Sequence, residues 1–326
     1  MGVIVGVDGG NTKTDVLVVG DDGELRAFVR GGGSNSHGPG GAEGAAAVVA
    51  KLVGRAGVTA PVGHGAFFLC GADDAGDIEA LERALEPHAL VRHAIVDNDT
   101  FALLRSGSDG GDAVAVVCGG GFNCVGRAAD GRTVRYPSLG WETGDWGGSE
   151  MLGREVLFHA ARGEDGRGKP TALVKIVRQE FELPTVAAVG EAIHYRRVPE
   201  QQLGRLAPKV LAAATAGDSV ARALVVRLAE EISLAVWRSL WDLGLIERRA
   251  DVVLGGGMLR AGTGLLHDEV VARIAHRAPA ATVVVPSEPP VLGSALEALR
   301  AAGAPAGAAQ RLRAAFSDGV EPEDVR

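Results

Sequence analysis

Between Asp8 and Thr14 the chain places an acid, two glycines and two hydroxyl side chains directly after a short β-branched run. A strand that ends in Asp8 would bring a carboxylate to a sheet edge, where it can hold a hydrated Mg²⁺. The amides, hydroxyls and ammonium group that follow suit phosphate oxygens, and they belong to Gly10, Asn11, Thr12, Lys13 and Thr14. An Asp-Gly turn is also a common hairpin connection, which is the alternative for this segment alone.

Two further glycine clusters follow apolar runs later in the chain. The first spans Cys118 to Asn123, contains Gly120 and Gly121, and would wrap another side of a triphosphate. The second is Gly255, Gly256 and Gly257, followed by a predicted short helix whose N-terminus would lie near a nucleotide. Glycine lets backbone approach a ligand closely. Each cluster alone is a weak signal, but their order and their shared position after strands indicate a nucleotide site.

The elements that must position these clusters begin with a strand meander. Apolar runs and turn residues predict strands at residues 3–8, 15–19 and 24–30. Periodicity then predicts a helix at 42–56, a strand at 66–69, a helix at 78–85 and a strand at 91–96. This alternation of strands and helices indicates an α/β sheet.

The same pattern starts again at residue 113, which indicates a second, similar domain. We predict strands at 113–117, 124–128 and 133–136, a mainly helical stretch at 151–245, strands at 251–254 and 282–285, and a helix at 291–301. Trp237 and Trp241 lie one helical turn apart and are interpreted as core residues. Beyond Gly303, the content of alanine, glycine and proline predicts a frayed or disordered tail.

Composition argues against several classes of protein. The 326 residues are 46% hydrophobic and 23% charged, which is enough for two domains. A net charge of −8 without a block of Lys and Arg argues against a nucleic-acid partner. The chain begins with no secretory leader and contains no apolar run of roughly 18 residues, so we expect a cytoplasmic protein without membrane contact. Cys70, Cys118 and Cys124 are expected to be buried structural thiols.

At its three glycine-rich segments the chain resembles the BadF/BadG/BcrA/BcrD-type ATPase family of the actin-like superfamily, which includes N-acetylglucosamine kinase. Asp8 to Thr14 match the family's first phosphate loop, Gly119 to Asn123 its second, and Gly255 to Gly257 its adenosine-side glycines. The resemblance implies an α/β fold of two ribonuclease-H-like domains with ATP in the cleft between them. Residues 1–107 with 291–326 would form the N-terminal small domain, to which the last helix returns, and residues 108–290 the C-terminal large domain.

The resemblance also implies an ATP- and Mg²⁺-dependent sugar kinase. Asn98-Asp99 resembles the family's Asn-Asp segment, in which the aspartate is the catalytic base that accepts a proton from the sugar hydroxyl. Asp97 is the competing base, and a simple helix cap is the structural alternative for Asp99 or Asn98. The 6-hydroxyl is the expected acceptor because the resemblance implies it.

Sugar contacts are expected from both domains. Ser34-Asn35-Ser36-His37 resembles the family's sugar-contacting Asn segment, and Gly140-Trp141 with the stretch Gly144 to Ser149 resembles its glycine, tryptophan and Gly-Asp segment. Amide and carboxylate groups suit vicinal hydroxyls, and an indole suits the apolar face of a pyranose. The expected substrate-binding residues are Asn35, Ser36, His37, Asp99, Asn123, Trp141, Glu142 and Asp145.

The chain departs from the family's pattern at two of these places. Where the acetylglucosamine kinases usually carry Ser-Gly-Thr-Gly-Ser-Asn, residues 118–123 read Cys-Gly-Gly-Gly-Phe-Asn and lose hydroxyls that could contact sugar or phosphate. Glu142 stands where the family more often has a smaller or differently polar residue, and it could pair with a 2-ammonium group. We therefore predict glucosamine as the substrate. N-acetylglucosamine or glucose is the alternative, and a solvated loop acid is the other interpretation of Glu142.

Two other functions within this family fit the chain less well. ATPases that activate dehydratases or reductases need cysteines presented for a shared iron–sulfur cluster, whereas Cys118 and Cys124 are expected to be buried. A non-catalytic sugar sensor would lack the base or the metal acid, but Asp8, Asp99 and Asp145 are all present. The long helices with Leu, Val and Trp leave a homodimer surface and a domain core as alternatives.

Overall fold

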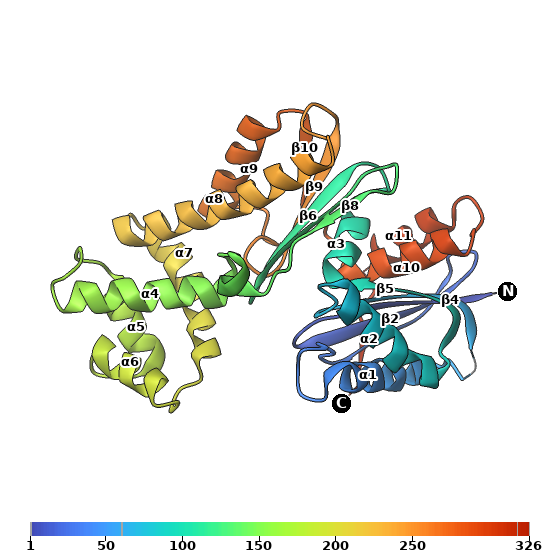
Figure 1. The fold of residues 1–326 in the computed structure, drawn as a ribbon, viewed down its shortest axis with the longest axis horizontal. Coiled ribbons are helices and arrows are strands. Elements are labelled where there is room, and N and C mark those ends of the chain that lie inside the picture. Colours follow the sequence, from blue (N-terminus) through green and yellow to red (C-terminus); the bar gives the residue numbers. More distant parts are fainter. Residues whose placement is uncertain (1, 60, 318, 326) are drawn as a thin grey trace. The chain divides into compact units, whose positions relative to one another are not determined.

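The computed structural model describes residues 2–59, 61–317 and 319–325, and it divides into two compact units that each contain a β-sheet (Figure 1). Unit 1 comprises the chain up to Ala113, the short segment Arg135–Pro137, and the chain from Pro286 onward. Unit 2 comprises Val114–Val134 and Ser138–Val285. The chain therefore passes from one unit to the other several times.

The sheet of unit 1 has six strands in the order β11-β3-β2-β1-β4-β5. They are β1 (Val3–Gly9), β2 (Lys13–Gly20), β3 (Leu25–Gly32), β4 (Val62–Leu69), β5 (Val91–Asn98) and β11 (Glu323–Asp324). β1, β2 and β3 form the predicted antiparallel meander, whereas β4 runs parallel to β1 and β5 parallel to β4. In this register Asp8 is level with Phe68, and Phe68 with Asp97. The carboxyl ends of β1, β4 and β5 therefore share one edge, where sheets of this kind bind ligands.

Helices cover both faces of this sheet (Figure 1). α1 (Gly41–Arg55) and α2 (Ala75–Leu85), which is followed by a 3₁₀ turn at Glu86–His88, pack on one face. α3 (Asp99–Gly107) and α10 (Pro290–Ala301) cover the other face. A Cβ on Gly6 would lie 2.5 Å from the backbone nitrogen of Ala295. A Cβ on Gly293 would lie 1.9 Å from the carbonyl oxygen of Ala102, so two glycines allow α10 to contact both β1 and α3.

The described residues beyond Gly303, 304–317 and 319–325, contain a helix and a short strand, so the expectation of a frayed tail was wrong. α11 (Ala308–Ser317) follows α10, and its Leu312 is fully buried. The ring of Phe316 lies 5.7 Å from that of Phe28 in β3, and β11 pairs with β3 in parallel register. Composition alone does not reveal that α11 has one apolar face. Tertiary packing of that face stabilises a helix that would be marginal in isolation.

The sheet of unit 2 has the strand order β10-β9-β6-β7-β8. Its strands are β6 (Ala113–Cys118), β7 (Phe122–Arg127), β8 (Thr133–Arg135), β9 (Ala250–Gly255) and β10 (Ala281–Val284). β6 and β9 are neighbours, and each leads into a glycine cluster. The sheet order therefore places the second and third glycine clusters beside each other.

The rest of unit 2 is mainly helical, as its periodicity predicts. Its helices are α4 (Gly148–Glu164), α5 (Leu173–Phe181), α6 (Val186–His194), α7 (Ala207–Thr215), α8 (Ser219–Asp242) and α9 (Leu265–Arg277), with 3₁₀ segments at Gly140–Thr143 and Glu200–Leu206. The interpretation of the α8 tryptophans as core residues is wrong for Trp241, whose exposed fraction is 57%, and Trp237 is half-buried. The centroids of the two rings lie 5.9 Å apart with the ring planes tilted by 40°, so the i,i+4 spacing here reflects a pair at or near the surface.

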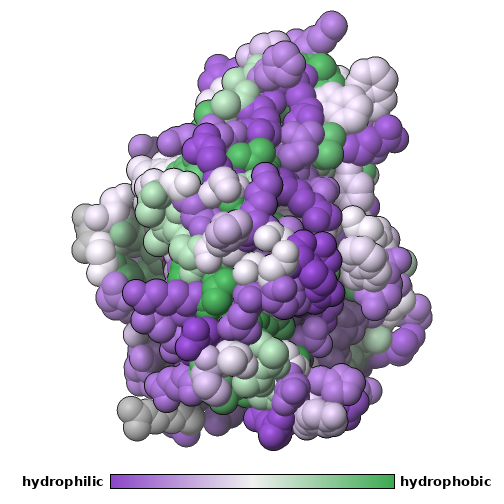
Figure 2. Space-filling view, turned by 90° about the vertical axis from the view of Figure 1, so that its left-hand side faces the viewer, coloured by the Kyte–Doolittle hydropathy of each residue, from purple (hydrophilic) through white to green (hydrophobic). Residues whose placement is uncertain are grey.

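On the face drawn in Figure 2, apolar side chains form small groups among hydrophilic ones. Large apolar side chains at the surface include Phe158, Tyr195 and Leu234. Within the described residues, no helix combines the length and the apolar character that crossing a membrane requires.

Candidate active site

The first predicted phosphate loop is the tight turn between β1 and β2. The amide of Gly10 donates to the carbonyl of Lys13 over 2.8 Å, which closes the turn and leaves Asn11 and Thr12 exposed. Asp8 lies one residue before the end of β1 and is partly buried. The loop thus presents polar groups beside a carboxylate at the carboxyl edge of the sheet.

Two side chains of this loop contact partners within unit 1. The Lys13 ammonium donates to Asp15 over 2.6 Å, and Arg30 Nε donates to the same carboxylate over 2.6 Å. Asp15 is fully buried, so these two cations offset the cost of burying its charge. The Thr14 hydroxyl is also buried and donates to Ser34 over 2.8 Å. Lys13 and Thr14 therefore anchor the turn, and a phosphate contact by either one stays a prediction.

The two candidate bases at the end of β5 have different environments. Asp97 is paired with Arg135, whose Nη1 lies 3.0 Å from Oδ1 and whose Nη2 donates to Oδ2 over 3.3 Å. Asp99, the first residue of α3, forms no ion pair with any other described residue. The carboxylate of Asp97 is thus neutralised by a cation, whereas that of Asp99 is not.

Asn98 is the residue that caps α3. Its side-chain oxygen accepts from the Thr100 amide over 2.9 Å, which satisfies one of the donors that a helix start leaves unpaired. Its side-chain nitrogen donates to Asp73 over 2.8 Å. The helix-cap alternative therefore applies to Asn98 and leaves the carboxylate of Asp99 available for chemistry.

Asp99 has the environment of a carboxyl group that titrates near neutrality. Burial, followed by the nearby charge of Asp73, raises the pKa of Asp99 to about 7, while hydrogen bonds from Thr100 act in the opposite direction. Burial is also the largest cause that raises the pKa of Asp73 to about 6. A general base works best when its pKa lies close to the working pH, so the environment of Asp99 suits that role.

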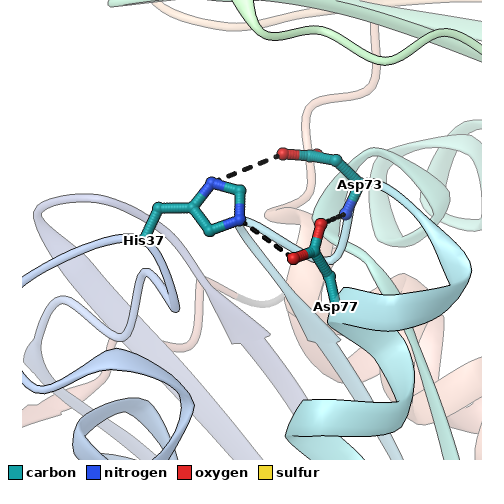
Figure 3. Close-up of side chains that lie close together, drawn as sticks. All are labelled: His37, Asp73 and Asp77. Carbon is teal, nitrogen blue, oxygen red and sulfur yellow. Dashed lines mark hydrogen bonds and ion pairs between the residues drawn. The ribbon is translucent and has the colours of Figure 1, made fainter.

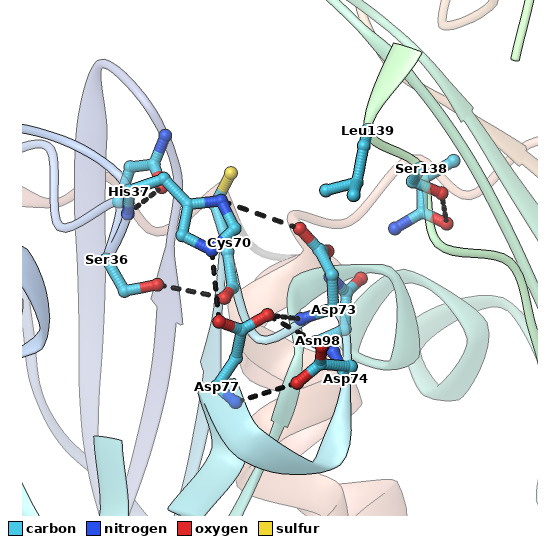
Figure 4. Close-up of polar contacts among 12 residues, drawn as sticks. Ser36, His37, Cys70, Asp73, Asp74, Asp77, Asn98, Ser138 and Leu139 are labelled. Atoms are coloured by element: carbon cyan, nitrogen blue, oxygen red, sulfur yellow. Dashed lines mark hydrogen bonds and ion pairs between the residues drawn. The ribbon is translucent and has the colours of Figure 1, made fainter. Parts of the chain in front are cut away.

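The Ser34–His37 segment lies at the same edge and contacts the loop after β4 (Figure 4). The Ser36 hydroxyl donates to the Gly71 carbonyl over 2.9 Å, and a Cβ on Gly71 would lie 2.3 Å from that hydroxyl. The Asn35 side chain donates to Asn11 over 2.5 Å and accepts from the His37 amide. The structure therefore joins the predicted sugar segment to the first phosphate loop.

The ring of His37 lies between two acids of the β4–α2 connection (Figure 3). Its Nε2 is 3.1 Å from Asp77 Oδ1, and its Nδ1 is 3.9 Å from Asp73 Oδ2. Asp77 forms a capping box with Asp74 at the start of α2, which fixes its side chain. Asp73 has a side-chain exposure of only 13%. One edge of unit 1 thus presents a histidine and several carboxylates.

The second and third glycine clusters pack against each other in unit 2. The Met258 amide donates to the Cys118 carbonyl over 3.1 Å, and a Cβ on Gly256 would lie 2.4 Å from the same oxygen. Gly256 has a φ of +85°, which glycine adopts without strain. Gly255 is buried at the end of β9, whereas Gly257 is exposed. Close backbone packing therefore requires glycine at the centre of the third cluster.

The short helix expected after Gly257 is absent from the described chain. Residues 257–261 form a hydrogen-bonded turn, and α9 begins only at Leu265. Gly262 and Gly264 have φ values of +61° and +92°, which are outside the helical range and interrupt the turn.

The second cluster also determines how α4 begins. The carbonyls of Gly119 and Gly120 accept from the amides of Ser149 and Glu150 over 2.8 and 3.1 Å, which satisfies two donors of the first helical turn. Gly148 has a φ of +81°, and a Cβ on it would lie 2.5 Å from the Gly120 carbonyl oxygen. The loop that carries Gly120 and Gly121 is thus held by α4.

A cavity of about 240 Å³ in unit 2 is lined by three of the predicted sugar contacts, Trp141, Glu142 and Asp145. The exposed fraction of Trp141 is 69%, so its ring is open to a ligand. Asn123, the fourth predicted contact in this unit, accepts from the Ser138 hydroxyl over 2.6 Å. Trp146 lies apart from these residues because it is buried beneath Arg227, whose guanidinium is 4.1 Å from the ring centroid.

The cysteines follow the expectation of buried structural thiols in two cases. Cys118 and Cys124 are fully buried, and burial raises the pKa of each thiol to about 12. Cys70 is only partly buried, so the expectation was wrong for this residue. Cys70 begins the loop that carries Asp73, where it is drawn near Ser36 in Figure 4.

Comparison with known proteins identifies the family. The sequence pattern of the BadF/BadG/BcrA/BcrD ATPase family matches residues 5–298, which contain every segment described above as part of the site. The chain belongs to this family.

Two proteins that are related to this chain in sequence are named as sugar kinases. The N-acetyl-D-glucosamine kinase of Dictyostelium discoideum is 25% identical over 316 residues, which cover 91% of this chain and 98% of that protein. The N-acetylmuramic acid/N-acetylglucosamine kinase of Clostridium acetobutylicum is 24% identical over 273 residues, which cover 82% of this chain and 89% of that protein.

Solved structures show the same fold. A protein of Chromobacterium violaceum, provisionally named an N-acetylglucosamine kinase, superposes with a TM-score of 0.69 at 23% identity, over 92% of this chain and 99% of that one. A ROK family glucokinase of Streptomyces griseus, solved with glucose and AMPPNP, gives a TM-score of 0.55 at 16% identity, over 92% of this chain and 100% of that one. The predicted α/β fold of the actin-like ATPases is confirmed.

Three residues at the candidate site were not singled out from the sequence. Asp73 follows β4 as Asp99 follows β5, so the rule that parallel strands share a carboxyl edge could have found it. Asp77 has no comparable signal, because it contacts His37 only through the fold. Arg135 pairs with Asp97 across 38 residues of sequence, and no local pattern indicates that pairing.

Proposed function

We propose that this chain is an ATP-dependent amino-sugar kinase that transfers the γ-phosphate to the 6-hydroxyl of glucosamine. The observation that carries the proposal is the contrast at the β5–α3 junction, where Arg135 neutralises Asp97 and Asp99 keeps a carboxyl group with a pKa near 7. Membership of an ATPase family and the names of two relatives support the reaction class.

In this mechanism Asp99 accepts the proton of the acceptor hydroxyl. The hydroxyl oxygen forms a bond to the γ-phosphorus while the bond from that phosphorus to the β,γ-bridging oxygen of ATP breaks. ADP and the sugar phosphate leave, and the proton passes from Asp99 to solvent. Since the transition state of phosphoryl transfer is loose, Asp99 contributes mainly by orienting the hydroxyl.

The glycine clusters are proposed to bind the nucleotide. Gly148 and Gly256 approach neighbouring backbone so closely that side chains are excluded, which leaves exposed backbone at Gly120, Gly121 and Gly257. Asp8 is proposed to hold Mg²⁺, because a carboxylate at a strand end offers the oxygen ligands that this ion prefers. The bound ion would neutralise charge on the phosphate oxygens.

The proposed preference for glucosamine follows from acidic side chains among the sugar contacts. Glu142 lines the cavity of unit 2, and Asp73 lies beside His37 and is coupled by charge to Asp99 in unit 1. An ammonium group would offset these negative charges, whereas a neutral acetamido group would not. N-acetylglucosamine is the second candidate because both named relatives act on it according to their names.

A coupled ADP-release assay with ATP and Mg²⁺ tests the function. The acceptors are glucosamine, N-acetylglucosamine, glucose and mannosamine, and we expect glucosamine to give the highest kcat/KM. Preference for the acetylated sugar would support the kinase function and contradict glucosamine as the preferred substrate. If no acceptor leads to ADP release, the result would contradict the kinase function and favour a sugar sensor.

Three variants locate the acid that recognises the ammonium group. Glu142→Gln and Asp73→Asn each remove a charge from a proposed contact, and we expect the glucosamine-to-glucose ratio of kcat/KM to fall about tenfold in at least one, a change worth about 1.4 kcal/mol. Asp74→Asn is the matched control, because Asp74 is exposed and asparagine caps a helix as well as aspartate. An unchanged ratio in both test variants would show that neither acid sets the preference.

A further inference from the structure

The segment Arg135–Ser138, which we call the strap, begins at the last residue of β8. Its first three residues group with unit 1, although Val134 before it and Ser138 at its end group with unit 2. Arg135 is the residue that pairs with Asp97. The chain therefore joins unit 1 for three residues between two segments of unit 2, and its Arg135 reaches the β5–α3 junction there.

Arg135 contacts one residue before Asp99 in the sequence and one residue after it. Its guanidinium lies within 3.0 and 3.3 Å of the two carboxylate oxygens of Asp97. Its central carbon also lies 5.1 Å from the centroid of the Phe101 ring. Asp97 precedes Asp99 by two residues and Phe101 follows it by two. One side chain thus holds the end of β5 and the first turn of α3 together.

An arginine suits this position for a physical reason. Its planar guanidinium can pair with both carboxylate oxygens and stack on an aromatic ring at the same time, whereas a lysine ammonium is a single point charge. The Phe101 ring is buried, so it offers a fixed surface for stacking. Asp97 is only 15% exposed, so solvent screens the ion pair in part.

The other end of the strap is attached to β7. The Ser138 hydroxyl donates to the side chain of Asn123 over 2.6 Å, and Asn123 is the second residue of β7 after the cluster that contains Gly120 and Gly121. Ser138 has a φ of +54°, a left-handed conformation that is uncommon for serine. It indicates a turn whose conformation is fixed by its contacts. Ser138 is thus held by a contact within unit 2.

We propose that Arg135 is a positioning residue for the catalytic base. The inference rests on the proposed function, in which Asp99 is the base. Arg135 acts through Asp97 and the first turn of α3 and does not itself take a proton. Its loss should lower kcat and leave the KM values for ATP and sugar nearly unchanged.

A double-mutant cycle in the full chain tests this role. Arg135→Gln is expected to lower kcat tenfold or more and Arg135→Lys by a smaller factor, with both KM values within threefold of wild type. In the Asp99→Asn background, Arg135→Gln should lower the residual turnover less than twofold, because the group that it positions has been removed. Equal losses in the two backgrounds would indicate a general structural effect and overturn the proposal.

Arg132→Gln is the matched control variant. Arg132 lies on the same β7–β8 hairpin and pairs with Asp130 at 2.9 Å, so its loss removes a similar ion pair at an exposed place. We expect its kcat to stay within twofold of wild type. A loss as large as that of Arg135→Gln would contradict a specific role for Arg135.

Hydrogen exchange supplies a readout that does not depend on turnover. The amides of the first turn of α3 should exchange faster in Arg135→Gln than in Arg132→Gln. Unchanged exchange would overturn the positioning role even if the kinase activity is present. A wild-type chain that releases no ADP with any sugar would instead overturn the base role of Asp99, and the inference with it.

Discussion

At the scale of single residues, two acids that lie two positions apart have opposite electrostatic environments. The Arg135 guanidinium pairs with both carboxylate oxygens of Asp97, whereas burial and the charge of Asp73 raise the pKa of Asp99. Groups whose environments differ in this way are often divided between structural and catalytic roles. Asp97 therefore holds the junction, and Asp99 is left for proton transfer in the proposed reaction.

Asp99→Asn tests this division directly. The amide keeps the size of the side chain but cannot accept the proton, so we expect kcat to fall by roughly a hundredfold or more. ATP and sugar should still bind with affinities close to wild type, as measured by calorimetry. Near-normal turnover would transfer the base role to Asp97.

The pH dependence of kcat/KM gives a second test of Asp99. The carboxyl group must be ionised to accept a proton, and its pKa of about 7 lies above the ordinary value of 3.8. Activity should therefore be lost as pH falls through 7, by about tenfold for each further pH unit. In Asp73→Asn the acid limb should move to lower pH, because a negative neighbour that raises the pKa of Asp99 is gone. An acid limb near pH 4 in wild type would contradict the assignment.

At the scale of elements, the glycine clusters serve packing in addition to the proposed binding of a nucleotide. Gly148 begins α4 against the Gly120 carbonyl, and Gly256 lies on the Cys118 carbonyl, so both loops are fixed by contacts that a side chain would block. Gly120, Gly121 and Gly257 stay exposed. A change in packing at Gly148 or Gly256 should therefore alter the proposed nucleotide site.

Gly148→Ala is expected to weaken both stability and ATP use. The added Cβ would lie 2.5 Å from a carbonyl oxygen, and φ is +81°. Gly166→Ala is the matched control, because Gly166 has a φ of +82° with no atom within 4 Å of a Cβ. We expect the control to cost about 1 kcal/mol in unfolding free energy and Gly148→Ala roughly 1–3 kcal/mol more. The KM for ATP should rise in Gly148→Ala alone, and equal effects in the two variants would show that the contact with Gly120 is unimportant.

The elements of the fold were largely predictable because their apolar periodicity is local. The meander of β1 to β3, the helical stretch before β9 and the helix α10 all follow from patterns within a few residues. The turn after Gly257 was mistaken for a helix because positive φ at Gly262 and Gly264 cannot be read from composition. The contrast between Asp97 and Asp99 was also beyond local patterns, since Arg135, which pairs with Asp97, comes from a distant part of the sequence.

At the scale of the whole molecule, the C-terminal tail completes unit 1. Leu312 is fully buried, Phe316 packs on Phe28, and Arg313 donates to the Ser106 carbonyl over 2.9 Å. These partners lie far away in the sequence, which is why the composition of the tail predicted disorder. The tail is therefore part of the unit that carries the proposed base.

Leu312→Ala measures this contribution. Removal of a fully buried leucine side chain leaves a cavity, so we expect a loss of about 2–5 kcal/mol in the free energy of unfolding. Leu234→Ala on α8 is the control, because that side chain is 38% exposed and should cost less than 1 kcal/mol. Denaturant unfolding of the two variants checks this, and similar midpoints would mean that the tail does not stabilise the chain.

The division of unit 1 along the chain has a consequence for how the protein is made. β1 and α3 leave the ribosome early, but α10, which packs on both of them, is synthesised only after all of unit 2. Unit 2 is almost continuous and can fold first, while the part of the sheet face in unit 1 that α10 covers stays exposed. At roughly 5–20 residues per second, this apolar face is open for many seconds on each nascent chain. Chaperone binding and aggregation should therefore begin at the N-terminal part of the chain, which is synthesised first.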